Sequence, residues 1–232
     1  MKKNNSKLVT ANIITAVVIS LVAIIFTVLV SKVDVAPVGS EQVSVGFSKL
    51  NAVFYNAIGY NELLYKVSEV FGYLSFLICG FFAFQGVMQL IKKKSLKKVN
   101  PRIYAIAGMY VAMLIVYILF EKVVINYRPL IIDSAEGLEA SYPSSHTILS
   151  LGICLSGLVT YPYFIRNKTT RLIVNVLTIV DLVGVLLCRL LSGVHWITDI
   201  LGGIFIASAL FAIYVTVINM INTAGAGEAK KK

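Results

Sequence analysis

Six long stretches of apolar residues, separated by short polar connections, dominate this chain of 232 residues. They cover roughly residues 8–30, 67–91, 103–121, 145–165, 172–191 and 197–221. Each approaches or exceeds the roughly 20 residues that a helix needs to cross the hydrocarbon of a bilayer. Hydrocarbon offers no hydrogen-bond partner to an open backbone, so such segments are expected to be helices. The pattern predicts an all-α polytopic membrane protein, with six transmembrane helices in one bundle and one domain over residues 1–232.

The first apolar stretch follows Lys2, Lys3 and Lys7, which is the arrangement found in signal peptides. Its apolar run is longer than that of a cleaved signal, and no cleavage site of small residues follows it. We therefore expect a retained signal-anchor helix. The overall composition agrees with a membrane protein, because 58% of the residues are hydrophobic and only 14% are charged.

The segment 33–66 is too long for a tight connection between two helices. Within it Phe47, Leu50, Phe54 and Ile58 recur at helical spacing, which predicts an interfacial helix that lies on the membrane. Two roles remain open at this point. The helix either guides a lipid sideways into a site or simply covers one end of the bundle.

Most of the 21 lysines and arginines lie at the N-terminus, in the connections 92–102 and 166–171, and in the C-terminal KKK. The positive-inside rule makes these segments cytoplasmic, so both termini are expected inside the cell. The segments 32–66, 122–144 and 192–196 then face the opposite side. The net charge of +10 is explained by topology and by anionic head groups, so we expect no nucleic-acid partner.

Three short polar blocks lie at the expected extracytoplasmic ends of the helices. They are EKVVINYRPL (121–130), YPSSHT (142–147) and CRLLSGVHWITD (188–199). Arginines match the oxygens of a phosphate in bidentate fashion, and a helix that opens on serines favours an anion at its first turn. The blocks therefore predict a phosphate site. Its candidate members are Lys122, Arg128, Ser144, Ser145, His146, Arg189, His195 and Asp199.

The chain contains only two histidines, and both lie in these blocks. His195 and Asp199 are four residues apart, so on a helix they share a face and the carboxylate can orient the imidazole. His195 would then attack phosphorus and form a phosphohistidine, while His146 acts as general acid and later as general base. No metal or other cofactor is needed for this chemistry. Taken singly, an interfacial arginine or a histidine at a helix end is more often structural.

At these blocks the sequence resembles the type 2 phosphatidic acid phosphatase family, whose motifs read KxxxxxxRP, PSGH and SRxxxxxHxxxD. Arg189, His195 and Asp199 reproduce the spacing of the third motif, with Cys188 in place of its serine. The block at 143–146 reproduces the second motif, with Ser145 in place of its glycine. The resemblance implies a six-helix fold and a metal-independent phosphatase in which His195 is the nucleophile, supported by Asp199, and His146 is the acid and base. It also implies that Arg128 and Arg189 bind the phosphate.

The first motif departs from the family pattern. Its lysine position holds Glu121, and Lys122 comes one residue later. One residue rotates a side chain by about 100° around a helix, so Lys122 reaches a phosphate only with a local distortion. We expect the Glu121 carboxylate to point away from the site or to pair with a basic neighbour, because it would repel a phosphate.

These observations predict an integral enzyme of the cell membrane that removes phosphate from a lipid phosphate or diphosphate on the extracytoplasmic face. Undecaprenyl diphosphate is the first choice of substrate, which would assign the enzyme to cell wall biogenesis. Phosphatidylglycerophosphate and phosphatidate are the nearest alternatives. A lipid phosphotransferase and a non-catalytic carrier of lipid phosphates also remain open. The lipid tail, the acceptor of the phosphoryl group, the oligomeric state, the origin of the C-terminal tail and the role of Asp181 within the fifth stretch stay undetermined.

Overall fold

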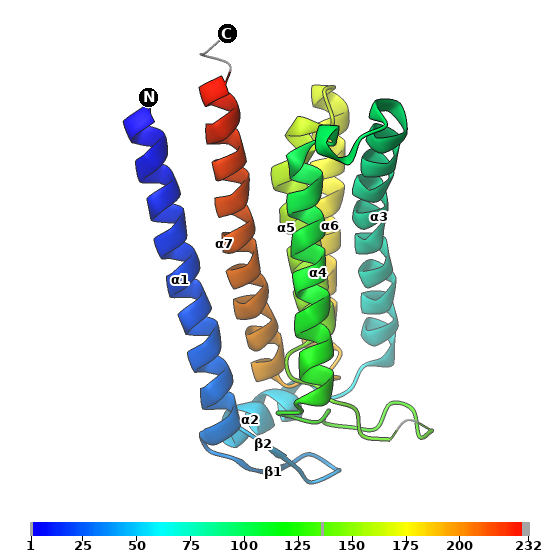
Figure 1. Ribbon diagram of the computed structural model, residues 1–232. Coiled ribbons are helices and arrows are strands. Elements are labelled where there is room, and N and C mark those ends of the chain that lie inside the picture. The colour runs from blue at the N-terminus through cyan, green and yellow to red at the C-terminus, as the bar shows by residue number, and fades with distance from the viewer. Residues whose placement is uncertain (1, 136, 229–232) are drawn as a thin grey trace.

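The computed structural model describes residues 2–135 and 137–228, with side chains described from residue 7 to residue 225 except residue 136. Six long helices lie side by side as one bundle, and α1 begins at the same end of the bundle at which α7 ends (Figure 1). This confirms the all-α membrane architecture. The long helices are α1 (Lys2–Lys32), α3 (Glu62–Lys93), α4 (Pro101–Lys122), α5 (Ser145–Thr160), α6 (Lys168–Leu191) and α7 (Ile197–Glu228).

Five of these helices are long and apolar enough to cross a bilayer, and α5 is the exception among the described residues. We expected the fourth span to cover 145–165, but α5 has 16 residues and ends at Thr160, where a short 3₁₀ turn, Tyr161–Tyr163, follows. Pro162 in that turn cannot continue a helix. The six-helix bundle is therefore observed with one helix that is shorter than a full span.

The short helix α5 occupies the middle of the bundle. It packs against α3, α4, α6 and α7, whereas α1 packs chiefly against α7. Most of its residues are buried, among them Ile148, Ile153 and Cys154. Because its neighbours rather than lipid surround it, α5 does not need the length of a lipid-exposed span.

Asparagines begin three of the helices in the same way. The side chains of Asn61, Asn100 and Asn167 accept hydrogen bonds from backbone N–H groups in the first turns of α3, α4 and α6. Such caps satisfy donors that the helix itself leaves unpaired. At the start of α4 the cap is followed by Pro101, whose fixed φ suits the first helical position. Another 3₁₀ turn, Leu96–Lys98, connects α3 to α4.

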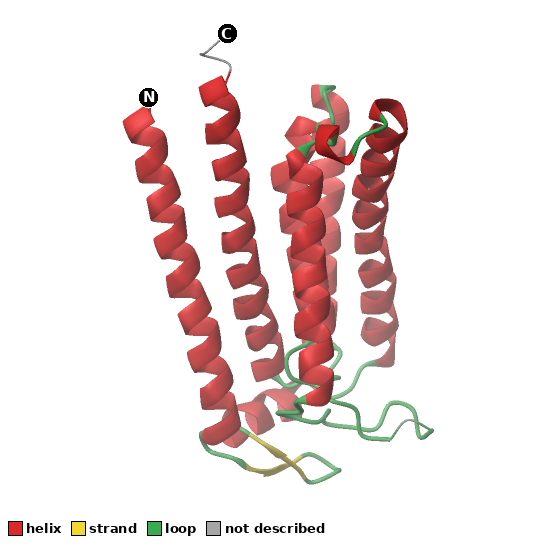
Figure 2. Cartoon of the chain, viewed as in Figure 1, coloured by secondary structure: helices red, strands yellow, loops and turns green. Residues whose placement is uncertain are grey.

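A small cap covers the end of the bundle opposite to the ends of α1 and α7 named above. It consists of the antiparallel strands β1 (Ala36–Val38) and β2 (Val43–Val45) and the helix α2 (Ser48–Ile58). Figure 2 shows the strands only at this end. The helix expected within 33–66 is observed as α2. The hairpin was not predicted, and the last residues of that segment belong to α3.

The cap packs on the residue that follows His195. Trp196 is buried against Val43 and Val45, and its ring centroid lies 5.5 Å from that of Tyr55. Asn51 of α2 donates to the carbonyl oxygen of Gly46 at 2.7 Å and to Thr198 Oγ1 at 3.0 Å. The cap is thus tied to the first turn of α7.

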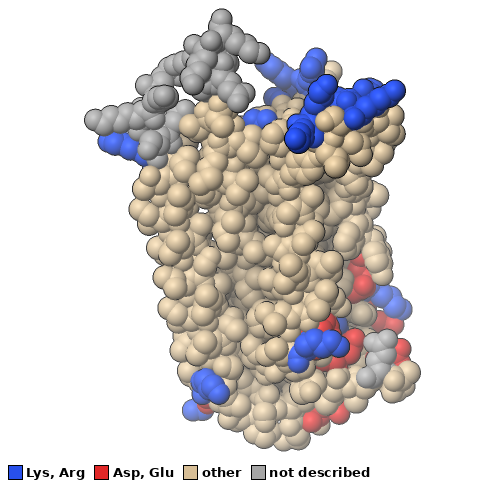
Figure 3. All heavy atoms as spheres, in the orientation of Figure 1, with Lys and Arg blue, Asp and Glu red and all other residues tan. Residues whose placement is uncertain are grey.

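The acidic side chains visible in Figure 3 lie toward one end of the bundle, together with some basic ones, whereas the opposite end shows basic side chains without acidic ones. The described basic residues at the end away from the cap include Lys7 of α1, residues of the α3–α4 connection such as Lys94 and Lys98, and residues of the α5–α6 connection such as Arg166. We call this the basic end, and the opposite end, which carries the cap, the site end. The C-terminal KKK lies outside the described residues.

Candidate active site

A cavity of about 370 Å³ opens at the site end, between the end of α4, the loop that follows it and the start of α5. Three of the candidate residues line it: Arg128, Ser145 and His195. Aromatic and aliphatic side chains such as Tyr117, Phe120 and Ile148 form much of the remaining wall. The polar blocks at 121–130, 142–147 and 188–199 therefore converge, as the sequence predicts.

His195 lies in the short loop between α6 and α7, and only 5% of the residue is exposed. Its Nε2 atom has no hydrogen-bond partner among the described residues. Burial, followed by the positive charges of Arg128, Arg189 and His146, lowers the pKa of His195 well below its ordinary value. The ring is therefore neutral at pH 7 and keeps the lone pair that a nucleophile needs.

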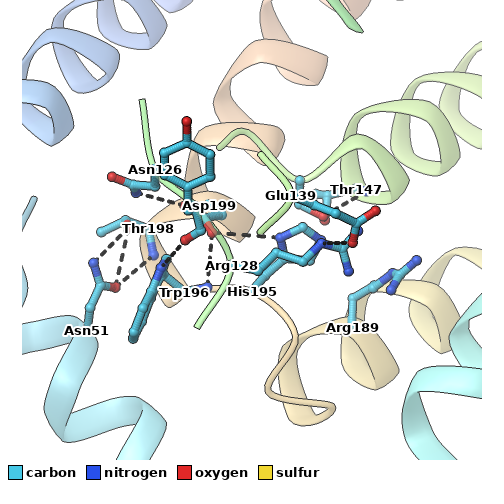
Figure 4. Close-up of polar contacts among 12 residues, drawn as sticks. Asn51, Asn126, Arg128, Glu139, Thr147, Arg189, His195, Trp196, Thr198 and Asp199 are labelled. Atoms are coloured by element: carbon cyan, nitrogen blue, oxygen red, sulfur yellow. Dashed lines mark hydrogen bonds and ion pairs between the residues drawn. The ribbon is translucent and has the colours of Figure 1, made fainter. Parts of the chain in front are cut away.

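Asp199 is held rigidly beside His195. Its Oδ1 accepts from Asn126 Nδ2 at 3.0 Å, and its Oδ2 accepts from the backbone N–H of Trp196 at 3.0 Å. The same Oδ2 lies 3.7 Å from His195 Nδ1, which is close enough for an ion pair but long for a hydrogen bond. Figure 4 shows these groups around the carboxylate. Asp199 thus both caps the start of α7 and faces the imidazole.

Arg128 is fixed by a loop of two paired segments. Its backbone N–H donates to the carbonyl oxygen of Glu139 at 3.0 Å, and its Nε lies 2.9 Å from Glu139 Oε2. The pairing is continued by a β-bridge between Tyr127 and Ala140. Arg128 Nη1 is buried and has no hydrogen-bond partner among the described residues. One edge of this guanidinium is therefore free to bind an anion.

The other two basic candidates meet at a carboxylate that the sequence did not suggest. Glu69 of α3 pairs through Oε1 with His146 Nε2 at 3.2 Å and, through the same oxygen, with Arg189 Nη2. The Arg189 side chain is fully buried and lies over the ring of Tyr65 at 5.1 Å. Glu69 accordingly holds an imidazole and a guanidinium side by side.

Several buried nitrogen atoms around this site lack a protein partner. Besides the two described above, Arg189 Nε and Nη1 have no hydrogen-bond partner within the described part of the chain. Leaving a buried cationic donor unpaired is costly, so such donors normally serve a ligand. The charges of Arg128 and Arg189 both act on the His195 imidazole, and guanidinium groups near an imidazole can form a cradle for a phosphate group. No group of three or more His, Cys, Asp or Glu side chains that would hold a metal ion occurs among the described residues.

Five of the candidates do not line the cavity: Lys122, Ser144, His146, Arg189 and Asp199. Ser144 is fully buried, and its Oγ accepts from the backbone N–H of Thr147 at 3.4 Å, so it caps α5. Lys122 is exposed at the end of α4 and does not line the cavity. Glu121 lines the cavity, whereas we expected it to point away from the site or to pair with a basic neighbour.

Sequence reasoning missed two residues that hold the site together, Glu69 and Asn126. A carboxylate inside an apolar stretch is a sign of function in a membrane protein, so Glu69 within 67–91 carried a usable signal. Asn126 carried none, because its role depends on a contact with Asp199 that lies 73 residues away along the chain.

A substitution at Gly193 is expected to displace the loop that carries His195. Gly193 has a φ of 69°, and a Cβ at this position would lie 2.0 Å from the carbonyl oxygen of Gly59. We expect Gly193→Ala to destabilise the protein by about 1–3 kcal/mol and to reduce activity at least about 10-fold, because the backbone has to move. Thermal unfolding in detergent and phosphate release measure the two effects.

Gly80 in α3 provides a matched control. A Cβ there meets no heavy atom within 4 Å, and no positive φ is involved. Gly80→Ala should leave activity unchanged and stability equal or higher, because alanine favours a helix over glycine. Full activity and an unchanged melting temperature for Gly193→Ala would contradict the proposed role of this tight contact.

Comparison with known proteins gives a family and a fold. A model of the PAP2 superfamily matches residues 73–223, which is more than half of the chain. A solved structure, described as a transmembrane PAP2 type phosphatidylglycerolphosphate phosphatase from Bacillus subtilis, superimposes with a TM-score of 0.57 at 17% sequence identity. The alignment covers 86% of this chain and 93% of that one. No curated protein matches the sequence.

Proposed function

The chain belongs to the PAP2 superfamily of phosphatases, and on that premise we propose that it hydrolyses a lipid phosphate or diphosphate through a phosphohistidine. The observation that supports this most directly is a set of buried nitrogens without a hydrogen-bond partner among the described residues, on two residues that line the cavity and on Arg189, whose charge acts on His195. They are His195 Nε2, Arg128 Nη1, and Arg189 Nε and Nη1. A nucleophile flanked by two guanidinium groups suits the in-line attack on a phosphate.

In the first step the lone pair on His195 Nε2 forms a bond to phosphorus, and the bond from phosphorus to the leaving oxygen breaks. The imidazole becomes positively charged as it is phosphorylated. Asp199, 3.7 Å from Nδ1, stabilises that charge. Arg128 and Arg189 bind the non-bridging oxygens, whose charge they neutralise in the transition state.

The leaving oxygen needs a proton, and His146 is placed to supply it. Glu69 Oε1, 3.2 Å from His146 Nε2, stabilises the imidazolium form that acts as a general acid, against the opposing effects of burial and of the Arg189 charge. Glu69 is thus a positioning residue that also keeps Arg189 next to His146. In the second step a water molecule gives a proton to His146 and attacks phosphorus, and the bond to His195 breaks.

The charge distribution supports an extracytoplasmic site. The basic end carries the described lysines and arginines of two connections, and the positive-inside rule favours the cytoplasm for such an end. The cavity lies at the opposite end of the helices, at the depth of lipid head groups. A lipid phosphate is therefore a better match than a soluble ester, and we take undecaprenyl diphosphate as the first candidate.

Phosphate release from purified lipids tests this proposal. The panel contains undecaprenyl diphosphate, phosphatidylglycerophosphate and phosphatidate, with and without a chelator. We expect release from at least the first lipid, and equal rates with chelator present. No release from any member would overturn the proposed function, and loss of activity with chelator alone would overturn the metal-free mechanism. Transfer of the phosphoryl group to an acceptor other than water would identify a phosphotransferase.

A further inference from the structure

An apolar groove extends from the active-site cavity toward the basic end, between α1, α4 and α7. The part of the groove next to the cavity has a volume of about 280 Å³ and is lined by small and aliphatic side chains, among them Ala23, Thr27 and Ala209. Almost none of its wall is polar. It faces the lipid side of the helices rather than an enclosed interior.

The groove begins at the floor of the cavity. Phe120 lines both the cavity and the groove. Tyr142, a cavity residue, packs edge-on against Phe120 with ring centroids 5.9 Å apart, and its hydroxyl lies 2.8 Å from Thr27 Oγ1 at the groove. The rings of Phe120 and Tyr142 therefore lie where the cavity and the groove adjoin.

The groove continues toward the basic end. Ser20 and Ile213 line the part next to the cavity and also a second apolar hollow between α1 and α7. That hollow, of about 370 Å³, extends to Ile13 and Met220. We call the two parts together the tail groove. At 1.5 Å per residue, the distance along α1 from Thr27 to Ile13 is about 21 Å.

This length distinguishes between classes of lipid. The hydrocarbon of one leaflet is about 15 Å thick, half of the roughly 30 Å of the bilayer. Ser20 lies about 18 Å along α1 from Lys32 at the site end, so the groove crosses the midplane and continues beyond it. The acyl chains of a phosphatidyl lipid end near the midplane. A single polyprenyl chain is long enough to fill the groove.

We propose that the tail groove binds the isoprenoid chain of the substrate, with the diphosphate held at His195. This inference rests on the proposed function and adds the class of lipid and the path of its tail. Hydrocarbon in the groove gains little from the hydrophobic effect, because lipid is equally apolar, so the groove contributes through fit and van der Waals contact.

A second groove, between α3 and α6, is the alternative path. It is larger, about 600 Å³, but shares no lining residue with the active-site cavity. Asp181 forms part of its wall and accepts from Ser75 Oγ at 2.7 Å. The other carboxyl oxygen, Oδ1, has no hydrogen-bond partner within the described residues. A polar group of this kind matches a hydrocarbon chain poorly.

A bulky residue inside the tail groove tests the inference. Ser20→Trp fills the point at which its two parts join. The assay compares undecaprenyl diphosphate with geranyl diphosphate, which has the same head group and a chain too short to reach Ser20. We expect kcat/KM for the long substrate to fall at least about 10-fold, mainly through KM, with that for geranyl diphosphate unchanged; a tenfold change corresponds to about 1.4 kcal/mol.

Two further variants make the result specific. Val18→Trp adds the same side chain to an exposed position on α1 that does not line the groove, and should have no effect. Leu77→Trp fills the groove between α3 and α6 and should also have none. An equal loss on both substrates with Ser20→Trp, or no loss on either, would overturn the tail groove alone.

If Leu77→Trp, and not Ser20→Trp, reduced kcat/KM for the long substrate alone, the tail would be assigned to the groove between α3 and α6. That result would overturn our assignment. Failure of the unsubstituted protein to hydrolyse either diphosphate is a different outcome. It would overturn hydrolysis of a polyprenyl diphosphate itself, and with it the assignment of the groove. The short substrate therefore separates failure of the chemistry from failure of the tail path.

Discussion

Replacing His195 with alanine is expected to reduce phosphate release by about 10⁴-fold or more. The variant removes the only imidazole among the described residues that line the cavity, a ring that is neutral at pH 7 and whose Nε2 has no hydrogen-bond partner among those residues. Arg128 and Arg189 remain, so binding of the lipid phosphate should change far less than turnover. Single-turnover phosphate release gives the rate, and equilibrium binding of the lipid in detergent gives the affinity.

A substitution of His195 is easier to interpret than a substitution of Asp199. The Asp199 carboxylate also accepts from Asn126 and from the backbone of Trp196, so its removal disturbs the start of α7. The His195 side chain makes no such structural bond through Nε2. An unchanged melting temperature of His195→Ala would show that the fold is intact. If that variant kept more than a tenth of the activity, another nucleophile would have to be sought, and a carrier that works without turnover would gain support.

The spans were predictable because their signal is local. A run of apolar residues long enough to cross a bilayer identifies a helix whatever its neighbours are, and α3, α4, α6 and α7 lie close to their expected bounds. The central helix α5 is the instructive difference. Hydropathy cannot tell a lipid-facing helix from one enclosed by four others, and only Pro162 marked the earlier end. The hairpin β1–β2 was missed because each strand has three residues, too few for a pattern.

The candidate site was predictable where its members are neighbours in sequence. His195 and Asp199 share a helical spacing, and the structure places them 3.7 Å apart. Glu69 lies on another helix, 77 residues before His146 in the chain, and no local pattern links the two. Its position in an apolar stretch was the one available hint. The structure therefore adds the carboxylate that pairs with His146, the proposed general acid.

The end of α4 shows how the orientation of a side chain escapes a motif. Glu121 takes the position at which the family pattern has a lysine, and it lines the cavity. Lys122 is rotated onto the exposed surface, as the angle of about 100° per residue requires. Of the two arginines that we propose bind the phosphate, Arg128 lines the cavity, whereas Lys122 of α4 does not.

Replacing His146 with alanine is expected to slow turnover by about 10²- to 10⁴-fold and to make the phosphorylated protein accumulate. The two steps respond differently. The leaving group from a lipid diphosphate is the lipid monophosphate. It needs less help from an acid than an alkoxide does, so His195 is still phosphorylated. The attack of water has no comparable substitute for the base, so the second step should slow more.

Phosphorylation of His195 can be measured directly in that variant. A lipid diphosphate with a labelled terminal phosphate should transfer the label to the peptide that contains His195, in a form that acid removes and alkali does not. The variant that lacks both His146 and His195 should carry no label, and a label retained there would exclude His195 as the nucleophile.

Glu69→Gln should slow turnover less than His146→Ala. It keeps the imidazole but removes the negative charge that lies 3.2 Å from it. An effect of Glu69→Gln on the melting temperature alone would limit Glu69 to holding α3 in place.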